Sequence, residues 1–323
     1  MRALVTGGAG FVGQWLCRAL LADGWEVSGA GPEAAPAHPL LSGEERRALR
    51  WLPMDVRRAA DVGAALDAAR PDAVFHLAGV SSVTGAAGDP GGTCEVNVAG
   101  AARLLGEVRA RRRAGALDPA VVVVGSAEQY GRHDPAEMPL RETAEQRPLN
   151  VYAASKAAQE VVALEAFRAD GVRVVATRSF NHSGAGQGER FLLPALVRRA
   201  LALRGDCAGG RPALVVGNRE TVRDFLHVAD VARAYILLAA HGAPGEVYNV
   251  ASGTGCRVAD LAARVLRAAG VPGADVTTDP ALVRAVEVPA LVGDSDRLRR
   301  ATGWAPTKTL DDIIDDLINA ATH

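Results

Sequence analysis

Cysteine is scarce in this sequence, and its spacing argues against two kinds of site. The 323 residues contain four cysteines, Cys17, Cys94, Cys207 and Cys256, which lie far apart and form no Cys-x-x-Cys pair. Such a pattern argues against a zinc site, so we expect no metal, and it provides no disulfide framework. Unpaired thiols fit a reducing compartment, and we therefore expect a cytoplasmic protein.

An excess of charge and long apolar runs are lacking as well. The formal net charge is −1, which gives no overall attraction to nucleic acid or to an anionic membrane. Four arginines fall within residues 109–113, a run that we interpret as the solvated end of a helix rather than a site for a phosphate polymer. No apolar run reaches the ~20 residues that span a bilayer, and no signal peptide precedes the first expected strand at Arg2. We therefore expect neither a nucleic-acid partner nor a membrane partner.

What the sequence does contain is a regular alternation of short apolar strands and helices. This alternation predicts βαβ units around a parallel sheet, a doubly wound α/β fold of the Rossmann type. The expected strands are 2–6, 26–30, 50–55, 72–79, 120–124 and 172–180. The expected helices are 14–22, 57–69, 95–114 and 152–170, with a loop and a short helix over 32–50.

The alternation breaks after Phe180, where "NHSGAGQGERF" reads as a polar, Gly-rich loop. Helices are expected at 192–204, at 258–269 and after Trp304, with a strand at 245–252. The stretch 220–240 reads as a loop that enters a helix. We expect a cofactor-binding domain of 1–180 plus about 220–250, and a smaller, discontinuous substrate lobe of 181–219 and 251–323.

A glycine-rich turn, "TGGAGFVG", joins the first strand to the first helix. Gly7, Gly10 and Gly13 allow a tight turn, backbone contact with a pyrophosphate and close packing of helix on strand. The helix N-terminus offers N–H groups and a partial positive charge to phosphates. We therefore expect a dinucleotide, NAD or NADP, held by the following residues: Gly7, Gly10, Phe11, Val12, Gly13, Asp55, Val56, Leu77, Ala78, Gly79, Tyr152 and Lys156.

The choice between NAD and NADP is left open by the sequence. An acid at the end of the second strand would hydrogen-bond the adenosine ribose and favour NAD. Gly31 stands at that position, and no arginine lies beside it to hold a 2′-phosphate. Asp55, after the third strand, is placed to meet the adenine amino group or, alternatively, to cap the next helix.

Three candidate catalytic residues follow strand ends of the same sheet. Ser126 follows "VVVVG", and Tyr152 and Lys156 share a face of the next helix at a spacing of four. A free tyrosine has a pKa near 10, and a nearby lysine ammonium would lower it toward neutrality. Ser126 would hold the substrate oxygen, Tyr152 would exchange its proton, and a nicotinamide would carry the hydride.

This set of Ser126, Tyr152 and Lys156, with the glycine turn before it, resembles the extended short-chain dehydrogenase/reductases. That resemblance implies an enzyme acting on a nucleotide sugar. In the related sugar dehydratases an acid–base pair, often Asp-Glu, follows the serine or threonine; here the pair is Ala127 and Glu128. One dehydratase group keeps only the glutamate, so Glu128 is either an acid–base residue or a residue that caps or orients the loop.

The second half of the chain is similar to GDP-4-keto-6-deoxy-D-mannose reductases. The resemblance rests on "RSFNHSGAGQG", "VGNRETVRDFLHVADVARAY", "GEVYNVASG" and "VRAVEVPALVGDSDRLRRATGWAP". It implies that the nucleotide-sugar substrate, a GDP sugar in these reductases, contacts Ser82, Asn181, Arg223 and Arg284. The guanidinium groups of the two arginines suit a diphosphate. Ala185 and Ala285 replace expected prolines near the substrate, which leaves room for a different base or sugar.

The expected activity is NAD(P)-dependent reduction of the C4 ketone of a GDP-4-keto-6-deoxy-hexose. A 4,6-dehydratase or C4-epimerase with tightly bound NAD(P) is the second hypothesis. A cofactor-binding regulator without catalysis is the third. The resemblance further implies a homodimer in which helices 95–114 and 152–170 of each subunit form a four-helix bundle.

Overall fold

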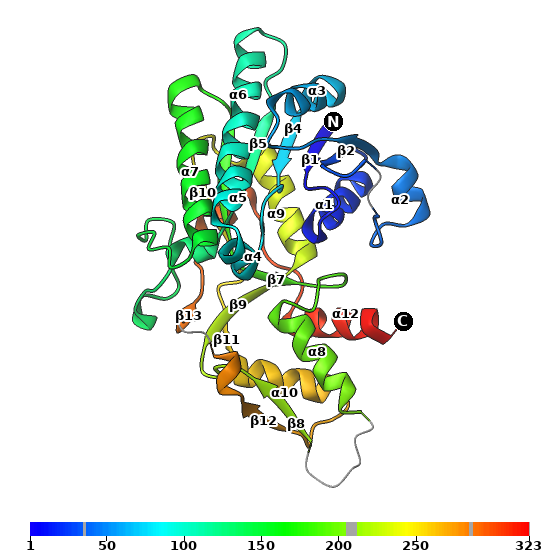
Figure 1. Ribbon diagram of the computed structural model, residues 1–323, viewed down its shortest axis with the longest axis vertical. Coiled ribbons are helices and arrows are strands. Elements are labelled where there is room, and N and C mark those ends of the chain that lie inside the picture. The colour runs from blue at the N-terminus through cyan, green and yellow to red at the C-terminus, as the bar shows by residue number, and fades with distance from the viewer. Residues whose placement is uncertain (35–36, 205–211, 284–286, 323) are drawn as a thin grey trace.

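The chain forms one large sheet with its helices and a set of smaller strands and helices below it (Figure 1). The structure is a computed structural model and describes residues 1–34, 37–204, 212–283 and 287–322. Within these residues no helix is long and apolar enough to cross a membrane. The large sheet lies in the upper part of Figure 1, and the smaller strands lie in the lower part.

The large sheet has seven strands, and every neighbouring pair is parallel. Its order is β10 (Val247–Val250), β6 (Val174–Ser179), β5 (Ala120–Ser126), β4 (Ala73–His76), β1 (Arg2–Thr6), β2 (Glu26–Gly31) and β3 (Arg50–Pro53). The order reverses direction between β1 and β4, and ligands of such sheets bind at the crevice beyond that point. The predicted Rossmann-type sheet is therefore confirmed.

Helices cover both faces of this sheet and bury two apolar cores. On one face α1 (Phe11–Ala22) and α9 (Val228–His241) pack on alternate residues of the strands. On the other face α3 (Ala59–Ala69), α6 (Gly100–Arg113) and α7 (Val151–Asp170) do the same. The run "VVVV" of β5 contributes Val122 to the first core and Val121 and Val123 to the second. A strand buried on both faces explains why it reads as a continuous apolar run.

A third core lies away from the large sheet. It joins α8 (Leu192–Ala202), α10 (Val258–Ala268) and α12 (Leu310–Thr322), which bury their apolar faces together. A two-stranded sheet of β8 (Ala213–Val216) and β12 (Asp275–Thr278) packs beside them. A four-stranded sheet holds β9 (Val222–His227) between β11 (Gly255–Arg257) and β13 (Ala290–Leu291), and β7 (Asn181–Ser183) also pairs with β9.

Several sequence-based element predictions need correction. The expected loop "NHSGAGQGERF" begins with strand β7, and the expected loop before α9 is strand β9. The expected helix 95–114 begins with a π-helical turn, Glu95–Ala99, before α6. The short helix expected within 32–50 is confirmed as α2 (Gly43–Ala48), and three short helices were not predicted: α4 (Val83–Gly88), α5 (Pro90–Cys94) and α11 (Asp296–Thr302).

The arginine run lies at the end of α6, as predicted. Arg111 pairs with Asp67 at 2.7 Å and Arg109 with Glu165 at 2.8 Å. These guanidinium groups are therefore matched by carboxylates of α3 and α7.

Candidate active site

The glycine turn has the geometry that a dinucleotide requires. Gly7 has a φ of 72°, and a Cβ there would lie 2.8 Å from the backbone nitrogen of Ala78 at the end of β4. A Cβ at Gly13 would lie 2.2 Å from the Gly7 carbonyl. Both glycines are therefore needed for the close crossing of turn, helix and strand. This crossing also brings the predicted cofactor residues Leu77 and Ala78 to the turn.

The first turn of α1 is suited to phosphate. Its N-cap is Gly10, so no side chain caps the helix, and no acidic residue lies in the first turn. Phe11, Val12 and Gly13 form that turn, where N–H groups and the helix dipole favour an anion. These features fit the diphosphate of NAD(P).

Asp55 lies just after β3, and its carboxylate is already engaged. Arg57 donates from Nε to Oδ1 at 3.0 Å and from Nη2 to Oδ2 at 2.6 Å. The Arg57 hydrogen bonds hold the pKa of Asp55 below its ordinary value. The neighbouring Val56 is buried and packs against Gly100. The proposed contact of Asp55 with adenine stays a prediction.

Ser126 and Tyr152 meet at the carboxyl edge of the large sheet. Ser126 ends β5, and its Oγ accepts from the backbone N–H of Glu128 at 3.2 Å. Tyr152 lies in the first turn of α7, which begins at Val151 because the Asn150 side chain caps the Ala153 N–H at 2.8 Å. The Ser126 side chain lies close enough to the phenol of Tyr152 to lower the pKa of that phenol. Two hydroxyl groups therefore lie close together where a carbonyl oxygen could bind.

Lys156 lies one turn further along α7 and is 5% exposed. Its Nζ donates to the Val124 carbonyl at 2.8 Å and to Oε1 of Gln159 at 2.9 Å. Burial lowers its pKa to about 8. A cofactor residue lies beside it, since a Cβ on Gly79 would lie 3.4 Å from Nζ. The ammonium is thus fixed between β5 and the turn after β4.

The pKa of Tyr152 differs from the sequence-based expectation. Burial raises it above the ordinary value of 10, the nearby Ser126 side chain lowers it, and the Glu128 carboxylate raises it further. We expected the Lys156 ammonium to lower it. Lys156 makes no such contribution here, and its Nζ is instead hydrogen-bonded to the Val124 carbonyl and to Gln159.

Glu128 lies on the same loop as Ser126, close enough to Tyr152 to disfavour its phenolate. The residue is partly exposed, in a short 3-10 helix that spans Ala127–Tyr130. Both roles considered for Glu128 therefore stay open.

Asn97 belongs to the site and was missed by the sequence analysis. It is fully buried in the π-helical turn. Its Nδ2 donates to Ser155 Oγ at 2.9 Å, and its Oδ1 accepts from the Val80 N–H at 2.8 Å. Asn97 thereby ties the turn after β4 to α7. An asparagine at an otherwise apolar helix position was the available signal.

A buried network of hydrogen bonds and one ion pair holds the Ser126 loop in place. Arg178 forms two hydrogen bonds with Glu160, from Nη2 to Oε1 at 2.7 Å and from Nε to Oε2 at 2.9 Å. Gln129 donates to Oε2 of Glu160 at 2.9 Å and accepts from the Ser126 N–H at 2.8 Å. Because Glu160 lies one turn beyond Lys156, this network fixes β5 and α7 relative to each other.

Two of the predicted substrate residues lie on neighbouring short strands. Asn181 of β7 pairs with Phe225 of β9, and Arg223 lies two residues earlier on the same face of β9. Ser82 instead caps α4, where its Oγ accepts from the Gly85 N–H at 3.1 Å. Arg284 lies outside the described residues, as does Ala285.

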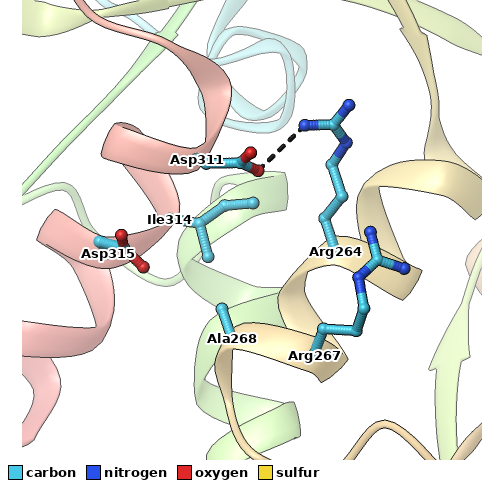
Figure 2. Close-up of a pocket in the computed structure, with 6 residues that line it drawn as sticks. All are labelled: Arg264, Arg267, Ala268, Asp311, Ile314 and Asp315. Atoms are coloured by element: carbon cyan, nitrogen blue, oxygen red, sulfur yellow. Dashed lines mark hydrogen bonds and ion pairs between the residues drawn. The ribbon is translucent and has the colours of Figure 1, made fainter.

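A surface pocket elsewhere does not belong to this site. It has a volume of about 230 Å³ and lies between α10 and α12 (Figure 2). Arg264 and Asp311 pair across it at 3.0 Å, and Arg267, Ala268, Ile314 and Asp315 complete its lining. None of the predicted site residues lines it.

Comparison with known proteins places this fold and site among nucleotide-sugar enzymes. The family described as GDP-mannose 4,6 dehydratase matches residues 4–317. GDP-6-deoxy-D-mannose reductase from Pseudomonas aeruginosa is 36% identical over 240 residues, 74% of this chain and 77% of that protein.

Two solved structures resemble the whole chain. One is RMD from Pseudomonas aeruginosa complexed with NADPH, with 30% identity, a TM-score of 0.81 and 100% coverage of both chains. The other is UDP-glucose 4-epimerase from Thermus thermophilus complexed with NAD. It has 28% identity and a TM-score of 0.83, over 99% of this chain and 98% of the other.

The fold and these comparisons define the class, an NAD(P)-dependent short-chain dehydrogenase/reductase of the nucleotide-sugar type. Within that class, the chain belongs to the GDP-mannose 4,6-dehydratase family.

Proposed function

We propose that the protein reduces the C4 ketone of a GDP-4-keto-6-deoxy-hexose and so forms a GDP-rhamnose type product. The observation that carries the proposal is the proximity of the Ser126 and Tyr152 side chains, at the end of β5 and in the first turn of α7. A ketone oxygen between these hydroxyls would receive two hydrogen bonds. Similarity to GDP-6-deoxy-D-mannose reductase supports the choice of substrate.

Tyr152 is in the protonated form that ketone reduction requires. Its raised pKa keeps the phenol protonated at neutral pH, ready to donate a proton to the developing alkoxide. Dehydration and epimerisation both begin by oxidising a sugar hydroxyl, which needs a base at the same place. The Ser126 hydroxyl would hold the oxygen in position.

The cofactor would lie along the glycine turn, with its diphosphate at the N-terminus of α1. When bound, its nicotinamide supplies the hydride. The Val124 carbonyl and Gln159 hold Nζ of Lys156, and with it a positive charge, at the carboxyl edge of the large sheet. That charge would stabilise negative charge that develops on the substrate oxygen.

The substrate diphosphate would bind beside β7 and β9. Arg223 supplies a guanidinium on the central strand of the four-stranded sheet, and Asn181 supplies an amide on the neighbouring strand. A planar guanidinium can donate two parallel hydrogen bonds to phosphate oxygens. Ser82 and Arg284 keep their proposed substrate roles.

Glu128 favours a second candidate, a 4,6-dehydratase. Its carboxylate lies close to Tyr152, where a group that moves a proton next to the C4 oxygen would be useful. The matching family is described as a dehydratase, which supports this alternative. The similar structure of an epimerase supports C4 epimerisation as a further alternative.

Mass spectrometry of products distinguishes these functions. Purified protein is given GDP-mannose alone, or GDP-4-keto-6-deoxy-mannose with NADPH or NADH. We expect the keto sugar to gain one hydride and one proton while the added cofactor is oxidised. Loss of water from GDP-mannose without net use of cofactor would instead establish the dehydratase. No turnover in any arm would mean that the substrate carries a different base or sugar.

Substitution of Glu128 sharpens this test. We expect Glu128→Gln to leave ketone reduction within about threefold of wild type, because Tyr152 supplies the proton. Glu145→Gln, at an exposed position in the loop between Glu128 and α7, is the matched control. If Glu128→Gln lost turnover while Glu145→Gln kept it, the result would favour the dehydratase.

A further inference from the structure

The indole of Trp51 covers the glycines at the adenosine end of the cofactor site. Trp51 lies in β3 opposite Gly29 of β2. A Cβ at Gly29 would stand 3.0 Å from ring atoms Cε3 and Cζ3, and a Cβ at Gly31 would stand 3.1 Å from Cη2 and Cζ2. A Cβ at Gly8 of the glycine turn would stand 3.4 Å from Cζ3. The six-membered ring therefore lies across the last residues of β2, next to the glycine turn.

Two contacts hold this ring in place. Its Nε1 donates to the Glu33 carbonyl at 2.8 Å. The imidazole of His38 meets it edge to face at a centroid distance of 5.1 Å. Arg46 in turn donates to the His38 carbonyl at 3.3 Å, which places a guanidinium group beside the residue that packs against Trp51.

Gly31 is the last residue of β2, the position from which an acid binds the ribose hydroxyls in NAD-binding sheets of this type. The same carboxylate would repel a 2′-phosphate. Here the position has no side chain, and the Trp51 ring fills the space that a side chain would enter. The Cβ of an aspartate at this position would press on the ring at 3.1 Å, so the ring would have to shift by a few tenths of an ångström.

We propose that Trp51 determines cofactor specificity: its ring keeps a carboxylate off the end of β2, so that the site binds NADP(H) at least as tightly as NAD(H). The proposal concerns cofactor binding and is independent of the sugar that the enzyme reduces. A binding measurement without sugar therefore tests it separately from the proposed reductase activity.

The test is isothermal titration calorimetry of NADP⁺ and NAD⁺ on four proteins: wild type, Gly31→Asp, Trp51→Ala and the double variant. For wild type we expect NADP⁺ to bind at least as tightly as NAD⁺. Gly31→Asp alone is expected to weaken both cofactors, because the new side chain collides with the ring. In the double variant the carboxylate has room, and we expect NAD⁺ to bind at least roughly tenfold more tightly than NADP⁺.

Two controls distinguish an effect at the cofactor site from a general loss of folding. Trp25→Ala removes an indole at the opposite end of β2 and should leave both dissociation constants unchanged. Thermal unfolding of each variant checks that it is folded. The proposal is overturned if wild type binds NAD⁺ more tightly than NADP⁺. It is also overturned if folded Gly31→Asp gains NAD⁺ preference with Trp51 present, or if the folded double variant gains none.

Discussion

At the scale of single residues, burial moves the pKa values of Tyr152 and Lys156 in opposite directions. The pKa of Tyr152 is raised, so the phenol stays protonated at neutral pH. The pKa of Lys156 is lowered to about 8, so its charge is lost as the pH rises through that value. Below pH 8 the site therefore holds both a proton on Tyr152 and a positive charge on Lys156, the combination that ketone reduction needs.

We predict that kcat/KM for ketone reduction is level near neutrality and falls above pH about 8, as Lys156 loses its proton. In Lys156→Arg the charge persists to much higher pH. The fall should then move upward by more than about one pH unit, even if the maximal rate is lower. The pH profiles of both proteins check this. An unchanged position of the fall in Lys156→Arg would assign it to another group.

The sequence predicted those site residues whose positions follow from their place within a single helix or strand. Tyr152 and Lys156 share a helix, and Ser126 ends an apolar strand, so all three were predicted and lie at the same sheet edge. Asn97 and Trp51 were not predicted as site residues. Their positions depend on contacts with α7 and β2, which are distant in sequence.

At the scale of elements, the loop after β7 is fastened to two helices. Ala185 stands where the reductases that this chain resembles carry proline, and its N–H donates to Oδ2 of Asp316 in α12 at 2.6 Å. Its carbonyl accepts from Nε1 of Trp15 in α1 at 3.1 Å. The Asp316 carboxylate also pairs with His227 at 3.3 Å. Alanine thus provides a donor that proline lacks.

We predict that Ala185→Pro lowers the free energy of unfolding by about 1–2 kcal/mol, because the carboxylate of Asp316 loses a donor. Urea unfolding measures the change. In an Asp316→Ala background the same substitution should cost less, since the acceptor is already gone. An equal cost in both backgrounds would show that the hydrogen bond contributes nothing.

Strand β9 shows why some elements could not be predicted. Asp224 lies in the middle of this strand and is fully buried. Its carboxylate accepts from the N–H groups of Ser252, Gly253 and Gly293, at 2.9, 3.0 and 3.3 Å. A charged residue in a short segment reads as a loop, and only distant loops supply the donors that permit its burial. The long apolar strands of the large sheet carry no such ambiguity.

At the scale of the whole molecule, the large sheet and its covering helices were predictable, because their periodicity extends over many residues. The small sheet around β9 is built from two- to six-residue strands far apart in the sequence. Pairings of this kind leave no local pattern. The division into a cofactor domain and a substrate lobe stays a prediction.

The outer faces of α6 and α7 favour the predicted homodimer. Ala102, Gly106 and Ala110 are exposed at four-residue intervals along α6, and a Cβ at Gly106 would meet no neighbour within 4 Å. Val161 of α7 is 61% exposed. Small residues at this spacing permit close approach of a second helix pair.

We predict that light scattering at micromolar concentration gives twice the chain mass of 33.5 kDa. Gly106→Glu should yield a monomer, because it places a charge in the centre of the helix contact. Ala320→Glu, an exposed position on α12, should remain dimeric. A monomeric wild type, or a dimer unaffected by Gly106→Glu, would contradict the four-helix bundle.

The measurement that tests the central claim most directly follows the hydride itself. GDP-4-keto-6-deoxy-mannose is incubated with NADPH that carries deuterium in both positions at nicotinamide C4, and the product is analysed by mass spectrometry. The account predicts that the sugar gains one deuteride and one proton, and that Tyr152→Phe lowers the rate by about 10²–10⁴-fold. A keto sugar returned without deuterium, together with loss of water from GDP-mannose, would contradict it.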